Sequence, residues 1–170
     1  MKTIISEKFL RIIRNKKQLE KLLDIKITNR GKEISCEGNP QDEEIAIQVF
    51  DALEFGFPFS TATLIKTENK IFTTFNVKEY TSKKNLASIR ARIIGKDGKA
   101  IRTLCNLSGC NMELKENEVG IIGEPEEIKN ATEGLIQLVQ GAKHGNVYSL
   151  LEKRQIQPIP DWGLKKGNKN

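Results

Sequence analysis

The chain has 170 residues, of which 38% are hydrophobic and 29% are charged, and its formal net charge is +6. This length suits one ordinary domain or two small ones in a soluble globular protein, and no apolar run approaches the ~20 residues of a membrane span. The positive balance favours an anionic partner, most commonly nucleic acid, although a solubilising surface would carry the same charge.

The first part of the chain, to about residue 57, predicts a strand, two helices, two strands and a closing helix. Its clearest section is residues 33–56, where a short β-like run is followed by a breaker at Gly38 and Pro40. A helix of about four turns then ends near Gly56, with proline at its start and glycine at its end as expected. Residues 58–70 form a connection, in which residues 61–65 predict one short helical turn.

Residues 118–141 repeat residues 33–56 at a shift of 85 positions, without a gap. The glycine and proline that separate the strand from the helix coincide, Gly38 with Gly123 and Pro40 with Pro125. Apolar positions coincide as well, such as Ala46 with Ala131 and Phe50 with Leu135. The match continues upstream with Leu19 on Leu104, and then breaks. We interpret the chain as two related units.

The two units differ where the match breaks. Five residues separate Ile13 from Leu19 in the first unit, whereas nine separate Ile94 from Leu104 in the second. The first unit has Arg14-Asn15-Lys16-Lys17 at this place, and the second has a loop bracketed by Gly95 and Gly98. The second unit therefore keeps a glycine loop that the first lacks.

The second unit predicts the same order of elements with clearer ends. We expect Ser82 to cap a helix whose apolar stripe is Leu86, Ile89 and Ile93, and Gly109 to end the helix that follows the loop. The predicted strands are residues 71–78, 110–114 and 118–122, the closing helix is 125–139, and a further short helix covers 146–154. The predicted class is α+β, with a three-stranded antiparallel-type sheet in each unit, covered on one face by three helices.

The glycine loop carries the chemistry of a phosphate site. Glycines remove the Cβ atoms that would hold a phosphodiester chain away from the backbone, and a helix beginning near Lys99 directs its positive end at the loop. Between residues 82 and 110 there are seven basic residues and one acidic residue. A plain helical turn with a solvated charged face is the alternative. The candidate site residues are Arg90, Arg92, Ile94, Gly95, Lys96, Asp97, Gly98, Lys99, Ile101, Arg102 and Met112.

An apolar groove beside the loop would receive the bases. We expect its floor to be formed by Ile94, Ile101, Met112 and Leu114, although each of these is at least as consistent with ordinary core. The aromatic content of 6% argues against a stacking platform, and the need for unstacked bases favours single-stranded RNA over duplex.

These residues resemble the KH family of RNA-binding modules, in the type I order, with the loop sequence IIGKDGK at residues 93–99. Over roughly residues 4–155 the chain is similar to the two-KH ribosome-assembly proteins called Partner of Nob, in which the first KH domain is degenerate. Further signs are Gly56-Phe57 and the run at 141–148. The resemblance implies two tandem type I KH domains: residues 1–65 without the loop, 66–145 with the GKDG loop, and 146–170 as a short helix and basic tail.

The resemblance also implies a function in ribosome assembly and pre-rRNA processing. It implies binding to single-stranded RNA in the 3′-end region of small-subunit rRNA, and partnership with the Nob endonuclease and, in archaea, a translation initiation factor subunit. Two alternatives stay open: a general mRNA-binding KH protein, and a protein-docking module with incidental RNA affinity. The short loop of the first unit puts a clamp by Arg14, Lys16 and Lys17 in doubt, although point-charge contacts with phosphates are compatible with it.

An enzyme is disfavoured by the residues themselves. The GKDGK sequence lacks the spacing and hydroxyl of a phosphate-binding P-loop, and one histidine, His144, leaves no evident catalytic set. For His144 we prefer a helix-capping role to a contact with a base or between the units.

The cysteines point to a reducing environment. Cys36, Cys105 and Cys110 are odd in number and form no zinc-ligand pattern, so neither a disulfide framework nor a metal or other cofactor is expected. We expect buried, inert thiols and a cytoplasmic location.

Overall fold

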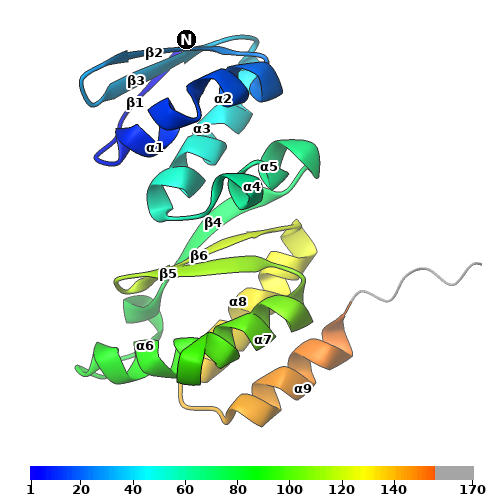
Figure 1. The fold of residues 1–170 in the computed structure, drawn as a ribbon. Coiled ribbons are helices and arrows are strands. Elements are labelled where there is room, and N and C mark those ends of the chain that lie inside the picture. The colour runs from blue at the N-terminus through cyan, green and yellow to red at the C-terminus, as the bar shows by residue number, and fades with distance from the viewer. Residues whose placement is uncertain (156–170) are drawn as a thin grey trace, which may run out of the picture.

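The computed structural model describes residues 1–155, and it repeats one order of elements twice (Figure 1). The first unit contains β1 (Lys2–Ile5), α1 (Phe9–Arg14), α2 (Lys16–Leu23), β2 (Lys26–Arg30), β3 (Glu33–Glu37) and α3 (Pro40–Phe55). The second contains β4 (Ile71–Asn76), the 3₁₀ turn η1 (Val77–Tyr80), α6 (Leu86–Ile94), the 3₁₀ turn η2 (Lys96–Gly98), α7 (Lys99–Ser108), β5 (Asn111–Lys115), β6 (Glu118–Gly123) and α8 (Pro125–Val139). The short helices α4 (Phe59–Ala62) and α5 (Leu64–Thr67) connect them, and α9 (His144–Arg154) follows.

Each unit has its own antiparallel three-stranded sheet, and the two sheets share one topology. The spatial order is β1-β3-β2 in the first and β4-β6-β5 in the second, with the last strand of each unit in the centre. The starts of β3 and β6 are separated by the same 85 residues as the starts of α3 and α8. The α+β class and the repeat of elements are therefore confirmed.

The closing helices begin where the sequence predicts. Proline occupies the first turn of both α3 and α8. The Asn39 side chain accepts a hydrogen bond from the Asp42 amide at 3.0 Å, and Glu124 with Glu127 forms a capping box. Gly56 follows α3 with a φ of 135°, a conformation that favours glycine.

Three local predictions were wrong. The cap of α6 is Asn85, whose side chain accepts from the Ser88 amide at 3.3 Å, so the helix starts later than a cap at Ser82 requires. The connection forms two four-residue helices, α4 and α5, because Thr63 starts a second turn. The last helix begins at His144, two residues before the predicted start, and the expected basic tail lies in residues 156–170, outside the described residues.

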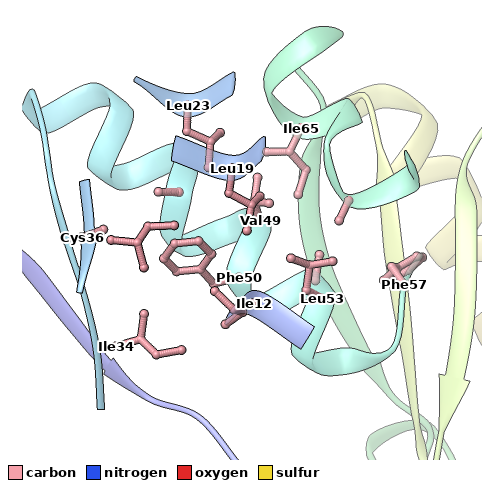
Figure 2. Packing of buried hydrophobic residues seen from close by; sticks show 14 of the residues in the cluster. Ile12, Leu19, Leu23, Ile34, Cys36, Val49, Phe50, Leu53, Phe57 and Ile65 are labelled. Atoms are coloured by element: carbon pink, nitrogen blue, oxygen red, sulfur yellow. The ribbon is translucent and has the colours of Figure 1, made fainter. Parts of the chain in front are cut away.

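The first core lies between the first sheet and its three helices. Its buried side chains come from α1, α2, α3, β2 and β3, with the partly buried Ile4 of β1 packed against them. Phe50 of α3 lies at the centre of the view in Figure 2. Ile12, Leu19 and Leu53 pack around that ring, and Ile34 and Cys36 contribute from β3. The second core is built in the same way, with Leu104 of α7 in the position of Leu19, and both are completely buried.

The outer face of the second sheet is covered by the first unit. Phe55 at the end of α3 and Phe57 beyond it contact Phe72 of β4, with ring centroids 5.8 Å and 5.9 Å from that of Phe72. Ile122 of β6 is buried in the first core, not the second. A Cβ on Gly120 would lie 2.7 Å from the Phe55 ring, so the glycine makes this approach possible. Two sheets and their helices therefore stack in one body, with α3, α4 and α5 between the sheets (Figure 1).

In the part of the chain that the structure describes, no helix has the length and apolar character needed to cross a membrane.

Candidate nucleic-acid interface

The glycine loop joins the end of α6 to the start of α7 in a very small space. The Gly95 amide donates to the Ala91 carbonyl at 2.8 Å and so closes α6, and the Gly95 φ is 73°. A Cβ on Gly95 would lie 2.5 Å from the Cβ of Ala100. Glycine is therefore required here by both conformation and contact, because any side chain would push the loop away from α7.

The second glycine has a different role. Gly98 has a φ of 72° and is the N-cap of α7, and beyond its two chain neighbours no atom of the described residues lies within 4 Å of the place where its Cβ would be. The Gly98 and Lys99 amides donate to the carbonyls of Gly95 and Lys96 within the loop. No side chain caps α7, so the amides that follow in its first turn can face an anion. Asp97 also has a positive φ, 54°, which turns the chain sharply between the glycines. The loop thus offers bare backbone at an open corner with a positive helix end behind it.

Cationic side chains surround this corner. Lys96, Lys99 and Arg102 are exposed, and Lys83 and Lys84 are exposed just before α6. The nearest acidic side chain in sequence, Asp97, is itself exposed in the loop. The predicted site residues Lys96, Lys99 and Arg102 therefore form a solvent-facing basic surface around Gly98.

The two arginines of α6 turn towards the protein. Arg90 donates to the Asn117 side chain at 2.6 Å, which ties α6 to the turn between β5 and β6. Arg92 donates to the Ala142 carbonyl, and a ring nitrogen of His144 lies 2.8 Å from the Arg92 carbonyl oxygen. His144 thus caps the last turn of α6 from the start of α9, and both arginines brace the helix that leads into the loop.

A hollow of about 320 Å³ lies beside the loop, between α7 and the edge strand β5. Ile101 and Met112 contribute apolar surface, and its other lining residues are Arg102, Cys105, Asn106 and Glu113. Ile94 is 39% exposed at the end of α6, whereas Met112 is only 7% exposed. Leu114 packs against the second core and is not among the lining residues, so two of the four predicted floor residues line this hollow.

The cysteines are free thiols in apolar surroundings. Burial raises the pKa of Cys110 to about 12, against a weaker lowering by its hydrogen bond with Ser108. Burial also raises the pKa of the half-buried Cys105. No group of three or more metal-ligating side chains is gathered anywhere in residues 1–155.

The matching corner of the first unit has a different shape. A single residue, Asn15, joins α1 to α2, and its φ of −104° is open to any residue. Arg14 and Lys17 are exposed beside it and Lys16 is half-buried. The first unit therefore has positive charge at this place but no glycine-lined approach to backbone amides.

The residues that hold the site in place were not predicted from the sequence. Asn117, Ala100 and Ala142 each receive a contact described above, and Cys105 and Asn106 line the hollow. The spacing of Ile101 with Cys105, and of Arg102 with Asn106, is one helical turn and predicts a shared face. The contacts of Asn117 and Ala142 have no sequence signal, because they join residues 27 and 50 positions apart.

A three-stranded antiparallel sheet in the order β4-β6-β5, with a glycine-bracketed loop between two of its covering helices, is the arrangement of a type I KH domain. Residues 71–156 match the family model of the second KH domain of PNO1, described as a eukaryotic-type KH domain of type I. The chain belongs to this PNO1-type KH-domain family.

Known proteins resemble this chain well beyond the second unit. A KH domain-containing protein of Methanocaldococcus jannaschii is 28% identical over 152 residues, covering 82% of this chain and 65% of the relative. The pre-rRNA-processing protein PNO1 of Yarrowia lipolytica is 30% identical over 103 residues, 59% of this chain and 40% of the relative. A chain of the a/eIF2alpha–aDim2p–rRNA complex from Pyrococcus horikoshii has a TM-score of 0.79 and 26% identity, covering 90% of this chain and 92% of that chain. This chain thus spans less than two thirds of the length of these curated relatives.

Proposed function

We propose that this protein is a non-catalytic factor of ribosome assembly and pre-rRNA processing that binds single-stranded RNA in the 3′-end region of small-subunit rRNA. The main support is the structure around Gly98. There the start of α7 has no side-chain cap, faces open space and is surrounded by exposed cationic side chains. The pre-rRNA-processing relative and the rRNA-containing complex support the choice of RNA.

The loop seats the sugar–phosphate chain. A phosphate oxygen that approaches Gly98 meets no Cβ and accepts hydrogen bonds from the loop and the first turn of α7. Lys96 and Lys99 supply positive charge close to the phosphate. At such short range, water screens their attraction to the phosphate only partly. These contacts fix the strand without reading its sequence.

The hollow between α7 and β5 receives the bases. Ile101 and Met112 offer apolar contact, while Arg102, Asn106 and Glu113 offer donors and acceptors at its sides. Such a groove requires bases that are free of a duplex, so single-stranded RNA is the ligand. Arg90 and Arg92 serve the interface by holding α6, and with it the loop, in position.

We further propose that residues 1–65 form a degenerate KH domain, that 66–145 form the binding KH domain, and that 146–170 add a short helix and a basic tail. The common sheet order and the missing glycines of the first unit support this division. The expected protein partners are the Nob endonuclease and an initiation factor subunit, and the a/eIF2alpha chain of the Pyrococcus complex supports the second. A cytoplasmic location completes the proposal.

The decisive experiment compares three RNAs by fluorescence anisotropy. One carries the 3′ end of small-subunit rRNA, the second is a shuffled single strand of the same composition, and the third is the first annealed to its complement. We expect the rRNA strand to bind at least about tenfold more tightly than either control, a difference of ~1.4 kcal/mol. Equal binding of the two single strands would instead indicate a general mRNA-binding protein, and a lack of RNA binding would favour the protein-docking module.

A further inference from the structure

A second hollow, of about 200 Å³, lies where α7 ends against α8 and α9. Asn106 lines both this hollow and the one beside the loop, so the two adjoin along α7. A strand held at the start of α7 and laid along it therefore reaches this second hollow at the other end of the same helix. The site is smaller than the ~300–1,000 Å³ of pockets for drug-sized ligands, which suits a single ring system.

The shape of the hollow suits a flat base. Leu107 and Leu151 are the apolar side chains of the lining, and Gly109 leaves one wall without a side chain. A Cβ on Gly109 would lie 2.8 Å from a carboxylate oxygen of Glu127, so this glycine makes room for the acid. A base with apolar faces and polar edges would meet apolar surface on one side and polar atoms around its edge.

The lining brings several hydrogen-bond acceptors to the hollow. The Asn130 amide nitrogen donates to the Arg154 carbonyl at 3.3 Å, and the Gln155 amide nitrogen donates to the Leu107 carbonyl at 3.4 Å. Each of these amides keeps its side-chain oxygen as an acceptor, beside one remaining N–H. Glu127 adds a carboxylate, one oxygen of which accepts from the Glu124 amide at 3.2 Å.

Among residues 1–155, Arg154 is the cationic side chain of the lining, and it is already paired. The Arg154 guanidinium forms an ion pair with Glu133 of α8. The hollow is thus unsuited to a phosphate, since its neighbouring charge is negative. It is suited to a group that donates hydrogen bonds.

Resting on the proposed RNA binding, we propose that this hollow is an additional base-reading site for the bound strand, selecting a base with an exocyclic amine and rejecting uracil. Adenine, cytosine and guanine each carry an exocyclic amine that donates to a carboxamide oxygen or a carboxylate, whereas uracil has no amine and offers only one ring N–H between two carbonyl oxygens. Asn106, exposed and between the two hollows, completes the base contact.

The test is uracil scanning of a short oligoadenylate, replacing one adenine at a time and measuring affinity by fluorescence anisotropy. For the unmodified protein we expect one position beyond the loop-held nucleotides where uracil weakens binding about fivefold or more, the lower range for a good base contact. In Asn106→Ala and Glu127→Gln this penalty should fall below about twofold. Glu126→Gln, an exposed neighbour outside the hollow, is the matched control and should keep the full penalty.

The effect of Glu127→Gln on RNA affinity distinguishes a contact of Glu127 with a base from simple charge repulsion of the RNA. Glutamine keeps a capping-box side chain at this position of α8, so the helix start is maintained. If Glu127 only repels RNA, the substitution tightens binding to every oligonucleotide equally and leaves the uracil penalty in place, which overturns the proposal. A uracil penalty that persists in Asn106→Ala overturns it as well.

Two further arms complete the design. A chain ending at Gln155 should keep the penalty, because every proposed acceptor precedes residue 156, and its loss would assign the reading to the remaining residues instead. Free adenosine monophosphate should not compete at concentrations where the oligonucleotide binds. Competition would overturn the proposal, because the hollow would then bind a free nucleotide and not a base of the held strand. Failure of the proposed function would look different, since Lys96→Asp would then leave the affinity for all oligonucleotides unchanged.

Discussion

The two units of this protein are built on one plan, yet each has an open surface where the other has none. The second unit opens at its glycine loop, while the outer face of its sheet is covered by Phe55 and Phe57. The first unit lacks the loop, while the outer face of its sheet stays open, with Thr3 and Thr28 exposed on either side of Ser35. The comparison shows that topology alone does not define a binding site, because a few side chains decide which surface remains accessible.

The difference between the central strands explains the covered face. In β3 the buried residues Ile34 and Cys36 alternate with more exposed ones, whereas β6 is buried from Val119 to Gly123. Val119 and Ile121 face the second core, and Ile122 is buried in the first. A strand that is apolar on both faces requires a layer on each side, and the aromatic end of α3 supplies the second layer.

The largest effect is expected at the covered face. Gly120→Val should lower the free energy of unfolding by about 3 kcal/mol, because its side chain would enter the space of the Phe55 and Phe57 rings. Ser35 occupies the same position of β3 at the shift of 85 residues, and Ser35→Val should change stability by no more than about 0.5 kcal/mol. Urea denaturation of both variants measures the difference, and equal losses would show that the face at Gly120 is not packed.

The next effect concerns charge at the two corners. Lys96→Asp should weaken RNA binding roughly 5- to 30-fold at low salt, because it places two acidic residues against a phosphate. With about three to five phosphates engaged, log K should fall with log salt at a slope of about −2 to −3.5, and the variant slope should be shallower by ~0.7. Lys17→Asp at the first corner is the matched change and should have a much smaller effect. Equal losses from the two substitutions would place RNA on both units.

A smaller effect, that of alanine at Gly98, separates its proposed role in RNA binding from its conformational role in the loop. Gly98 and Gly31 both have positive φ, 72° and 59°, and at both the place of a Cβ is clear to 4 Å of every atom in residues 1–155 other than the glycine and its chain neighbours. Alanine at either should therefore lower stability by a similar ~1 kcal/mol through backbone strain. Only Gly98→Ala should also reduce RNA affinity, because its methyl group would stand where the phosphate approaches. Binding of Gly98→Ala that matches Gly31→Ala would contradict a phosphate seat at this corner.

The smallest effect is a change in thiol reactivity. Burial raises the pKa of both Cys105 and Cys110, so at pH 8 both should react with iodoacetamide much more slowly than in the unfolded chain. RNA should slow Cys105 further, since it lines the hollow beside the loop, and should leave the buried Cys36 of the first unit unchanged. Mass spectrometry of the modified peptides measures each rate, and a Cys105 rate that RNA does not alter would place the strand elsewhere.

Much of the loop was predictable from the sequence, and its supports were not. Gly95 and Gly98 indicate positive φ, and the structure gives both that conformation. The prediction for Arg90 and Arg92 treated them as cations beside the loop, whereas their hydrogen bonds reach Asn117 and the carbonyl of Ala142. The sequence does not reveal whether a long basic side chain faces solvent or bonds within the protein, because the outcome depends on which acceptors the fold places within its reach.

The sequence by itself determined the elements, their repetition at 85 residues and the one place where a glycine loop survives, because proline, glycine and apolar spacing act through local backbone energetics. Only the tertiary structure decided that the second sheet is covered and that His144 closes the last turn of α6. It also decided that the hollows along α7 adjoin at Asn106. Each of these depends on residues distant in the chain meeting at atomic range, and no local propensity encodes such a meeting.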